Sequence, residues 1–549
     1  MLKKKLLRTM CATLAVIFCS VGCTGKEAGT VKEGPMNTAP PDYTTTEATV
    51  DMYAYIPPTD GHYTTEHDSI MYGESNITKE RYQEYKDCGF NILLSDDEFY
   101  GGSMKTPTVE SDKEYFENSQ TKEILDLCEE VGLKAIVFDY RVWRLSRSEV
   151  SLIKTEDTAK PLWFWHGDVV YYPEEVQYDT ASGVLTLSDG KQITPEFVQY
   201  QFDSEEALKS YIEVVMSSYK DHPAFYGMRM IDEPSEEKLT AVGQTTRAIK
   251  NLYPGCYVPT CLHPHYGPAQ GDLLVATDEG FQQYLDMYIT ESQNEHFGYD
   301  YYPFVGEVIS ETKAENTTVL NTYVRALQIS ALKAKEHNVD WELIIQTYSF
   351  PSETKRVVNE RDIRLQSNMA LAFDASTIGY FTYWMWPVKT IVAPEPQGTW
   401  QAIMSDTGEK ILYDQVQKVN AETQELAKVL LNYDYVATHL SWDKDYGVMP
   451  NYFANVESSE LTNVKSITTG RPTVLNEMYD EKNKLTGYMI VNAADTNEES
   501  YNRVEIEFSG YDKAVVYTAE GPTEVELEDH TYLTILKGGE AVFVIPYRQ

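Results

Sequence analysis

His222-Pro-Ala-Phe-Tyr-Gly-Met-Arg-Met-Ile-Asp-Glu-Pro234 is the stretch on which the fold prediction rests. Its apolar part, residues 225–231, predicts a short strand that ends at Asp232 and Glu233. The polar residues 235–237 behind it predict the start of a helix, since acids are favoured at helix N-termini. The two acids therefore either cap this helix or lie at the C-terminal end of a strand, where α/β folds bind their ligands.

Strand and helix patterns alternate on both sides of this stretch. Eight apolar segments predict strands: 53–56, 91–96, 134–139, 225–231, 257–261, 297–304, 341–348 and 377–384. The segments between and after them predict helices: 78–88, 122–131, 204–219, 236–252, 279–289, 317–337, 360–373 and 408–431. Continuous apolar strands that alternate with helices predict a closed parallel (β/α)8 barrel over residues 51–432.

Two segments depart from this alternation. Residues 146–202 contain an alternating pattern between Gly183 and Gly190, which predicts a hairpin in an insertion after the third strand. We expect this insertion to form a lid or a wall of the site; its Trp163 and Trp165 either stack on a sugar or form its own small core. Short strands at regular intervals in residues 433–549 predict a C-terminal all-β sandwich.

The N-terminal residues predict export. A basic segment, residues 1–8, precedes an apolar segment, residues 10–18, that is too short to cross a bilayer, so residues 1–22 are expected to be a signal peptide. Residues 20–23 resemble the lipobox of bacterial lipoproteins, with Ser20 in place of the usual Leu. The resemblance implies a lipidated Cys23, and the composition of residues 23–50 predicts a flexible tether.

Composition excludes some partners. Lys and Arg total 46 against 85 Asp and Glu, and the net charge of −39 disfavours binding to nucleic acid or to anionic lipid headgroups. The chain has 41 Tyr, whose rings carry a polar group and suit surfaces that stack on sugars. No Cys and His residues have the spacing of a zinc site, and we expect no metal and no organic cofactor.

Four motifs resemble clan A glycoside hydrolases, in particular relatives of the family 42 β-galactosidases. They are residues 226–234, Asp300-Tyr-Tyr-Pro303, Arg364-Leu-Gln366 with residues 370–372, and residues 379–384. The resemblance covers about residues 51–387. It implies a glycosidase on a (β/α)8 barrel, with Glu233 as the proton donor.

A second carboxyl group is required, because glycosidic hydrolysis needs one acid and one nucleophile or base. The clan A pattern places a glutamate at the end of the seventh strand, where this chain has Gln346 instead. We favour Asp300, which lies at the end of a predicted strand among tyrosines, and then Asp139. Other candidate carboxylates are Asp96, Asp97, Glu98, Glu342 and Glu353, and each is also explained as an ordinary loop acid.

Further residues are candidate substrate ligands because of their place at predicted strand ends. The resemblance implies that Trp384 and Trp386 stack on the sugar, although both could instead seal the barrel against the C-terminal domain. The others are Asp232, Asp139, Arg141, His263, His265, Tyr302, Gln346 and Tyr348.

Two functions are consistent with this pattern. The first is an exported glycoside hydrolase, held at the cell membrane by its lipid, that acts on an oligosaccharide or glycan. The alternative is a surface lipoprotein that binds glycan without cleaving it, because Gln346 replaces the expected nucleophile. The sequence indicates neither the sugar nor an oligomeric state.

Overall fold

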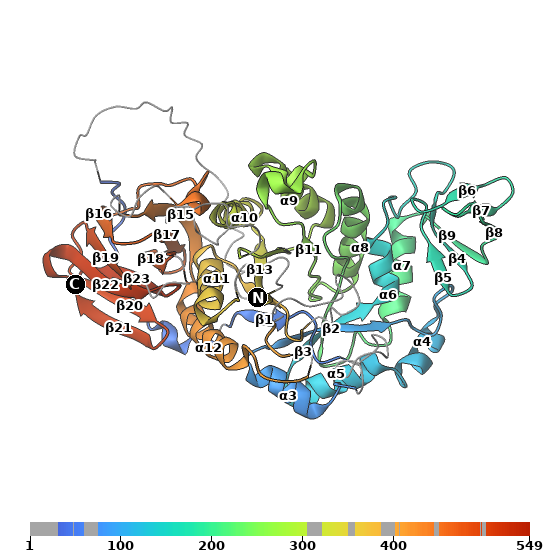
Figure 1. Ribbon diagram of the computed structural model, residues 1–549, viewed down its shortest axis with the longest axis horizontal. Helices are drawn as coiled ribbons and strands as arrows, with labels where there is room; N and C mark the ends of the chain where they lie inside the picture. The colour runs from blue at the N-terminus through green and yellow to red at the C-terminus, as the bar shows by residue number, and fades with distance from the viewer. Residues whose placement is uncertain are drawn as a thin grey trace.

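The computed structural model describes residues 31–47, 49–59, 75–304, 321–349, 357–385, 401–405, 407–443, 450–494, 496 and 501–549. Over these ranges the chain is a mixed α/β protein with several β-sheets. An α/β unit is followed by a β-rich C-terminal unit at one end of the molecule (Figure 1). The predicted signal peptide, Cys23, Glu353 and Trp386 lie outside the described residues.

Eight parallel strands form the centre of the α/β unit, and each overlaps one of the predicted strands. They form two sheets, with strand orders β1-β14-β13-β12-β11 and β10-β3-β2. The sequence predicted that all eight strands would form one closed sheet. Their bounds are β1 Asp51–Ala54, β2 Ile92–Phe99, β3 Lys134–Asp139, β10 Phe225–Met228, β11 Cys261–Leu262, β12 His296–Tyr301, β13 Asp340–Gln346 and β14 Thr377–Phe381.

Backbone hydrogen bonds connect the two sheets at both of their edges. The Asn91 N–H, just before β2, donates to the Met52 carbonyl of β1 over 3.1 Å. At the other edge the Met228 N–H of β10 donates to the Tyr257 carbonyl over 2.9 Å, and Gly227 forms a parallel bridge with Tyr257. The backbone before β11 therefore runs beside β10.

Helices follow the strands as the sequence predicts. They are α3 Lys79–Asp87, α5 Gln120–Val131, α7 Glu205–Met216, α8 Leu239–Leu252, α9 Asp278–Ser292, α10 Tyr323–His337, α11 Glu360–Ala372 and α12 Tyr413–Leu430. Short 3-10 turns are η1 Tyr43–Thr45, η2 Glu236–Lys238, η3 Gly267–Gln270, η4 Leu274–Ala276, η7 Asn451–Phe453 and η8 Glu528–His530. None of the helices in the described ranges combines the length and apolar character needed to cross a bilayer.

Two short helices were not predicted, because each depends on local capping rather than on a long apolar period. Thr108 and Ser111 form a reciprocal capping box at the start of α4, Val109–Phe116. Asp139, the last residue of β3, accepts a hydrogen bond from the Arg141 N–H and so starts α6, Tyr140–Ser146. The chain therefore turns from β3 into α6 without a loop.

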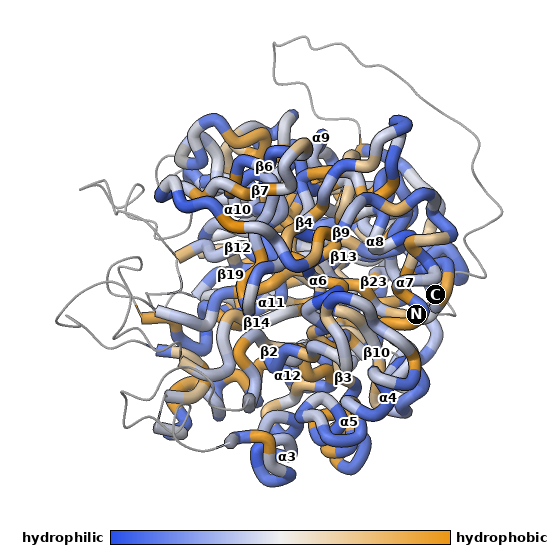
Figure 2. The backbone as a smooth tube through the Cα atoms, turned by 90° about the vertical axis from the view of Figure 1, so that its right-hand side faces the viewer, coloured by the Kyte–Doolittle hydropathy of each residue, from blue (hydrophilic) through white to orange (hydrophobic). Residues whose placement is uncertain are grey.

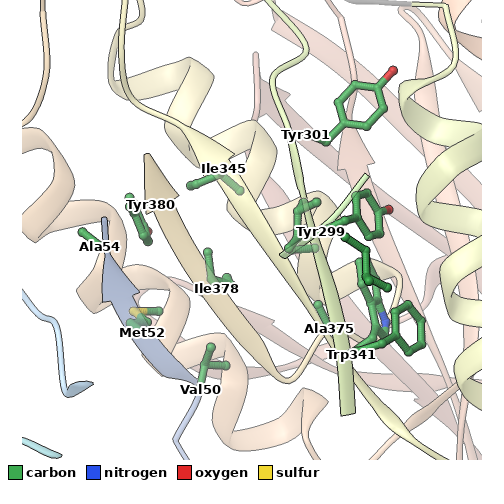
Figure 3. Packing of buried hydrophobic residues seen from close by; sticks show 14 of the residues in the cluster. Val50, Met52, Ala54, Tyr299, Tyr301, Trp341, Ile345, Ala375, Ile378 and Tyr380 are labelled. Carbon is green, nitrogen blue, oxygen red and sulfur yellow. The ribbon is translucent and has the colours of Figure 1, made fainter. Parts of the chain in front are cut away.

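Both faces of the central strands are buried, which accounts for their continuous apolar sequence. One face packs on the helices: Met52 and Ala54 of β1 lie beside Ile378 and Tyr380 of β14 and Ile345 of β13 (Figure 3). Alternate residues form a separate cluster on the opposite face, made of Tyr53, Ile92, Leu94, Ile136, Tyr257, Cys261 and Ile344. The outer helix α3 is hydrophilic along most of its length, apart from its buried tyrosines (Figure 2).

Gly227 is required at the contact between β10 and the chain before β11. A Cβ added there would lie 2.1 Å from the Tyr257 carbonyl oxygen, so the two backbones would have to separate. We expect Gly227→Ala to lower the free energy of unfolding by about 1–3 kcal/mol, as overpacking does. Thermal or urea unfolding measures the change. The control is Gly255→Ala, whose added Cβ meets open space; an equal effect of both variants would contradict the argument.

The insertion after β3 holds more strands than the predicted hairpin and lies at the end opposite the C-terminal unit (Figure 1). One antiparallel sheet contains β4 Pro161–His166, β5 Val169–Tyr171 and β9 Phe197–Tyr200, and the other contains β6 Gln177–Asp179, β7 Val184–Thr186 and β8 Gln192–Ile193. Phe164, Leu185 and Ile193 form the insertion's own core. Trp163 is buried in the main core instead, and Trp165 is half-buried.

The C-terminal unit consists of two antiparallel sheets. Its six-stranded sheet has the order β15-β17-β18-β23-β20-β21, and its three-stranded sheet has the order β16-β19-β22. Buried residues of both sheets, such as Leu475 and Val504, share one cluster. The strands are β15 Asp434–Ser441, β16 Val464–Thr469, β17 Thr473–Asp480, β18 Leu485–Asn492, β19 Tyr501–Phe508, β20 Lys513–Thr518, β21 Gly521–Glu526, β22 Thr531–Lys537 and β23 Ala541–Tyr547.

Residues 31–47 pack against this unit, so the prediction of a flexible tether over residues 23–50 is wrong for this part. The buried Asn37 amide donates to the carbonyls of Thr486 and Pro546, each over 2.7 Å. The buried Tyr43 hydroxyl donates to Asp480 over 2.6 Å. Hydrogen bonds of two side chains, Asn37 and Tyr43, hold the segment in place. Amino-acid composition does not predict such single contacts.

Candidate active site

Three carboxyl groups meet where β10, β11 and β12 end. Asp232 and Glu233 follow β10, and the Glu233 N–H donates to the Cys261 carbonyl of β11 over 2.8 Å. Cys261 is in register with Gly298 of β12, and Asp300 lies two residues further along the same strand. The strands are parallel, so these residues share one edge of the fold.

Asp300 is the most buried of the three acids, with 7% of its surface exposed. Burial raises its pKa well above the ordinary value of 3.8, and the negative charges of Glu233 and Asp232 raise it further. Hydrogen bonds with Tyr302 and Cys261 act in the opposite direction. Within the described structure its Oδ1 has no hydrogen-bond partner. A buried carboxyl oxygen without a partner disfavours the folded state, and such groups are candidates for function.

Glu233 lies closer to solvent and its side chain is 42% exposed. Partial burial and the charge of Asp232 raise its pKa to about 7. Its backbone φ is +42°, a left-handed conformation that is uncommon for residues other than glycine and often marks functional sites. His263 Nδ1 lies 3.8 Å from Glu233 Oε1, and burial lowers the pKa of His263, so its ring is favoured in the neutral form.

Arg229 supplies a cation near these acids, and the sequence analysis missed it. Its guanidinium pairs with Asp96 and lies 5.0 Å from the ring centre of Phe138 and 5.4 Å from that of Tyr55. Burial lowers the pKa of Arg229, but the charge of Asp96, and less strongly that of Asp232, raises it above the ordinary value. A lone cation inside an apolar strand, three residues before Asp232, was the available signal.

Tyr302 and Tyr348 form a group of rings with Phe381 next to Asp300. The ring centres of Tyr302 and Tyr348 are 4.9 Å apart, and both lie 5.4 Å from Phe381. The backbone N–H of Tyr302 donates to the Tyr266 hydroxyl over 3.0 Å. The two tyrosines predicted as substrate ligands therefore lie together, beside the buried acid.

Gln346 alternates with Glu342 and Ile344 on the inner face of β13, but the protein's own backbone binds both ends of its amide, so the structure gives no support to its predicted role as a substrate ligand. The side chain is fully buried. Its Oε1 accepts from the Phe304 N–H over 3.0 Å and its Nε2 donates to the Tyr348 carbonyl over 3.2 Å. Both ends of the amide fix the backbone after β12 and β13, so Gln346 positions the segments that carry Tyr302 and Tyr348.

Asp139 and Arg141 are also wrong as substrate ligands. Both side chains are at most 1% exposed and pair with each other, and Arg141 pairs with Asp112 at 2.6 Å. Asp139 additionally accepts from the Tyr219 hydroxyl at 3.1 Å. This buried ion cluster joins β3 and α6 to α4, and its charges are already compensated.

His265 and Trp384 are buried as well, which corrects two further predictions. His265 bonds the Val275 carbonyl at 2.7 Å and Asp278 at 2.9 Å, so both ring nitrogens are used. Trp384 is fully buried, with the Arg81 guanidinium 5.4 Å from its ring centre. Trp384 therefore stacks on the protein's own side chains.

Three of the alternative second carboxylates, Glu342, Asp96 and Asp97, are bound by other partners in the described structure. Glu342 is fully buried at the other end of β13, where it accepts from the Tyr53 hydroxyl at 2.7 Å and bonds His296 at 3.2 Å. Asp96 pairs with Arg229, and Asp97 accepts from the Thr59 hydroxyl at 2.7 Å. Asp300 is the favoured candidate that the structure brings to Glu233.

Comparisons with known proteins give likeness at the level of structure alone. No protein-family model and no curated protein match the sequence. One similar solved structure is described as "Glycoside hydrolase"; it is 9% identical, the alignment covers 91% of this chain and 93% of that chain, and the TM-score is 0.45. A glycoside hydrolase family 5 protein from Bacteroides vulgatus is 9% identical over 91% and 89%, with a TM-score of 0.45. A GH27 β-L-arabinopyranosidase from Geobacillus stearothermophilus is 8% identical over 92% and 97%, with a TM-score of 0.43.

Proposed function

We propose that this protein is an exported glycoside hydrolase that cleaves glycosidic bonds in oligosaccharides or glycans. Glu233 is the general acid and Asp300 is the second carboxyl group. The observation that carries the proposal is the position of these two acids at the ends of β10 and β12, on either side of β11, where burial and neighbouring negative charge raise the pKa of both. Ligands meet side chains at this edge of parallel α/β folds.

Two interacting acids of this kind can supply the two roles that the reaction requires, a proton donor and a nucleophile or base. When two carboxyls interact strongly, their protons leave in separate steps, so that over a range of pH one is protonated and the other ionised. Glu233 is assigned as the acid because a pKa of about 7 keeps it partly protonated near neutral pH, and its side chain is exposed enough to reach a leaving group. Its proton passes to the glycosidic oxygen as the bond to the anomeric carbon breaks.

Asp300 then acts as the carboxylate. Its Oδ1, which has no partner among the described residues, attacks the anomeric carbon or takes a proton from the attacking water. The positive charge that develops on the sugar favours the ionised form of Asp300, against the burial that raises its pKa. Tyr302 stabilises this ionised form by its hydrogen bond.

The finer architecture belongs to the same proposal. We infer one closed (β/α)8 barrel, because hydrogen bonds join both edges of the two parallel sheets and strands from both contribute to one inner cluster. The shared core of the two C-terminal sheets supports a β-sandwich. Export and a lipid on Cys23 rest on residues 1–23 of the sequence.

A second candidate function is glycan binding without cleavage. The observation that favours it is Gln346, since an amide that is held by Phe304 and Tyr348 cannot replace the expected glutamate. A screen of aryl glycosides and natural glycans for released sugar distinguishes the two. Release by the wild-type protein that is lost in Glu233→Gln supports the hydrolase; binding without release under all conditions contradicts it.

The pH dependence of turnover tests the coupling between Asp232 and Glu233. Because Glu233 must be protonated, kcat/KM should fall as the pH rises through about 7. Asp232→Asn removes a negative charge that raises the pKa of Glu233, so the same fall should occur at lower pH. The control is Asp286→Asn, a surface acid on α9. An unchanged profile in Asp232→Asn would show that another group is the acid.

A further inference from the structure

A row of four aromatic side chains follows the ends of β2 and β3. We call Tyr100, Phe138, Tyr140 and Trp143 the aromatic strip. Tyr100 follows β2 directly, Phe138 is the second-last residue of β3, and the other two lie on α6. Since β10, β3 and β2 are parallel neighbours in one sheet, the strip begins at the same edge as Glu233.

The rings of the strip follow one another in contact. Phe138 and Trp143 have ring centres 6.2 Å apart, Trp143 stacks on Tyr140 at 5.4 Å with 14° between the planes, and Tyr140 lies 5.3 Å from Tyr100. At the other end the Arg229 guanidinium lies 5.0 Å from Phe138 and is coupled to Asp232. A continuous row of side chains therefore leads from Arg229, three residues before Asp232, to Tyr100.

The strip remains accessible although its rings pack on one another. Tyr100 is 39% exposed, and the other three rings are half-buried. A fully internal cluster would be buried throughout, as Tyr85 and Phe90 are. The exposed parts of these rings offer apolar surface to a ligand that is itself apolar on one face and polar at its edges.

The buried Arg144 packs against Tyr140 of the strip. It is 1% exposed, and its guanidinium lies 4.8 Å from the ring centre of Tyr140, 5.0 Å from that of Trp165 and 5.5 Å from that of Trp163. In the described part of the chain it forms no ion pair, and its Nε has no hydrogen-bond partner. The three rings and the nearby negative charge of Glu98 therefore compensate this buried cation in place of a direct ion pair.

The physical effect of this arrangement is to hold Tyr140 and the insertion strand β4 in one position. Arg147, the C-cap residue of α6, lies 3.9 Å from the Tyr172 ring centre and 5.9 Å from that of Trp143. Two cations therefore lie near rings of the strip and of the insertion. Rings that are fixed before a ligand arrives lose little entropy on binding, which increases affinity.

We propose that the aromatic strip is a sugar-binding subsite for a glycan chain whose cleaved bond lies at Glu233 and Asp300. The substrate is then an extended oligosaccharide or polysaccharide, and a single terminal sugar does not fill the site. This inference rests on the proposed function for the position of the cleaved bond, but binding at the strip does not itself require cleavage.

The test compares chain lengths in the full-length protein. The probes are cello-, xylo-, manno- and galacto-oligosaccharides from disaccharide to hexasaccharide, together with aryl monoglycosides. Trp143→Ala should raise KM for the longest chain that is cleaved by about 10-fold, which is the loss expected for one aromatic contact. Turnover of the disaccharide and of the aryl glycoside should stay within about twofold of wild type. Trp143→Phe should restore most of the affinity for the long chain.

Tyr501→Ala is the matched control, because Tyr501 is a 62% exposed ring on β19 in the C-terminal unit. It should change no KM. Thermal unfolding of each variant checks that the fold is kept, and Tyr140→Phe, which keeps the ring and its stacking, should resemble wild type. An equal loss at all chain lengths, or no loss at any, would overturn the strip as a subsite.

Binding without turnover separates this inference from the proposed function. If wild type cleaves no glycan but calorimetry shows that it binds long chains about 10-fold more tightly than Trp143→Ala does, the subsite stands and the hydrolase fails. If wild type cleaves glycans of every length and Trp143→Ala cleaves them equally well, the hydrolase stands and the subsite is wrong.

Discussion

Glu233→Gln should lower kcat/KM for a natural glycan by about 10²–10⁴-fold, the contribution that general acid catalysis makes. The amide has nearly the same size but cannot deliver a proton to the leaving oxygen. The side chain is 42% exposed and packs little, so the thermal unfolding midpoint should not fall. Steady-state kinetics on the glycan identified by screening measures the effect.

The chemistry of the leaving group identifies which role Glu233 has. An aryl glycoside with a strongly acidic phenol needs no protonation, so Glu233→Gln should retain much more activity on it than on a natural glycan. Glu237→Gln, an exposed acid on the turn after Pro234, is the matched control and should behave as wild type. If both substrates lost activity equally, Glu233 would be the nucleophile or base instead of the acid.

Asp300→Asn should reduce turnover at least as much as Glu233→Gln, and equally on both kinds of substrate. No leaving group can replace a missing carboxylate at the anomeric carbon. The variant should also be no less stable than wild type at neutral pH. The raised pKa means that the folded protein holds a proton that the unfolded chain releases, so Asp300 disfavours folding increasingly as the pH rises above 3.8.

Lost activity with preserved stability would distinguish a catalytic role of Asp300 from a structural one. Thermal midpoints of wild type and Asp300→Asn, measured from acid to neutral pH, should converge at low pH, where the aspartate is protonated in both states. Asp362→Asn serves as the comparison, because Asp362 is a buried acid that caps α11. There the substitution should lower the midpoint. A fall in stability of Asp300→Asn similar to that of Asp362→Asn would mean that Asp300 has a structural role.

Much of the α/β unit could be predicted because its signals are repeated along the chain. Each predicted strand is an apolar run buried on both faces, as Tyr53 and Met52 illustrate on β1, and such runs need no knowledge of distant residues. The short helices α4 and α6 could not be predicted in the same way. Their starts depend on a capping box and on Asp139, which are single side-chain contacts.

A site residue could be predicted from the sequence only where its position along a strand decides whether it reaches the site. Asp232, Glu233 and Asp300 follow from the ends of β10 and β12. Arg141, His265 and Trp384 failed because burial depends on what packs against them from other elements, such as Asp112, Asp278 and Arg81. Gln346 failed for a related reason, since the groups that bind its amide are backbone atoms whose position is set by folding.

The contacts of residues 31–47 decide where a recombinant form of the protein can be cut. A boundary drawn at β1 would remove Asn37 and leave the carbonyls of Thr486 and Pro546 without their donors inside the β-rich unit. It would also remove the Lys32 carbonyl, which accepts from the Asn463 N–H at 2.8 Å. An expression clone that keeps this unit intact therefore starts upstream of Lys32, even though β1 begins only at Asp51.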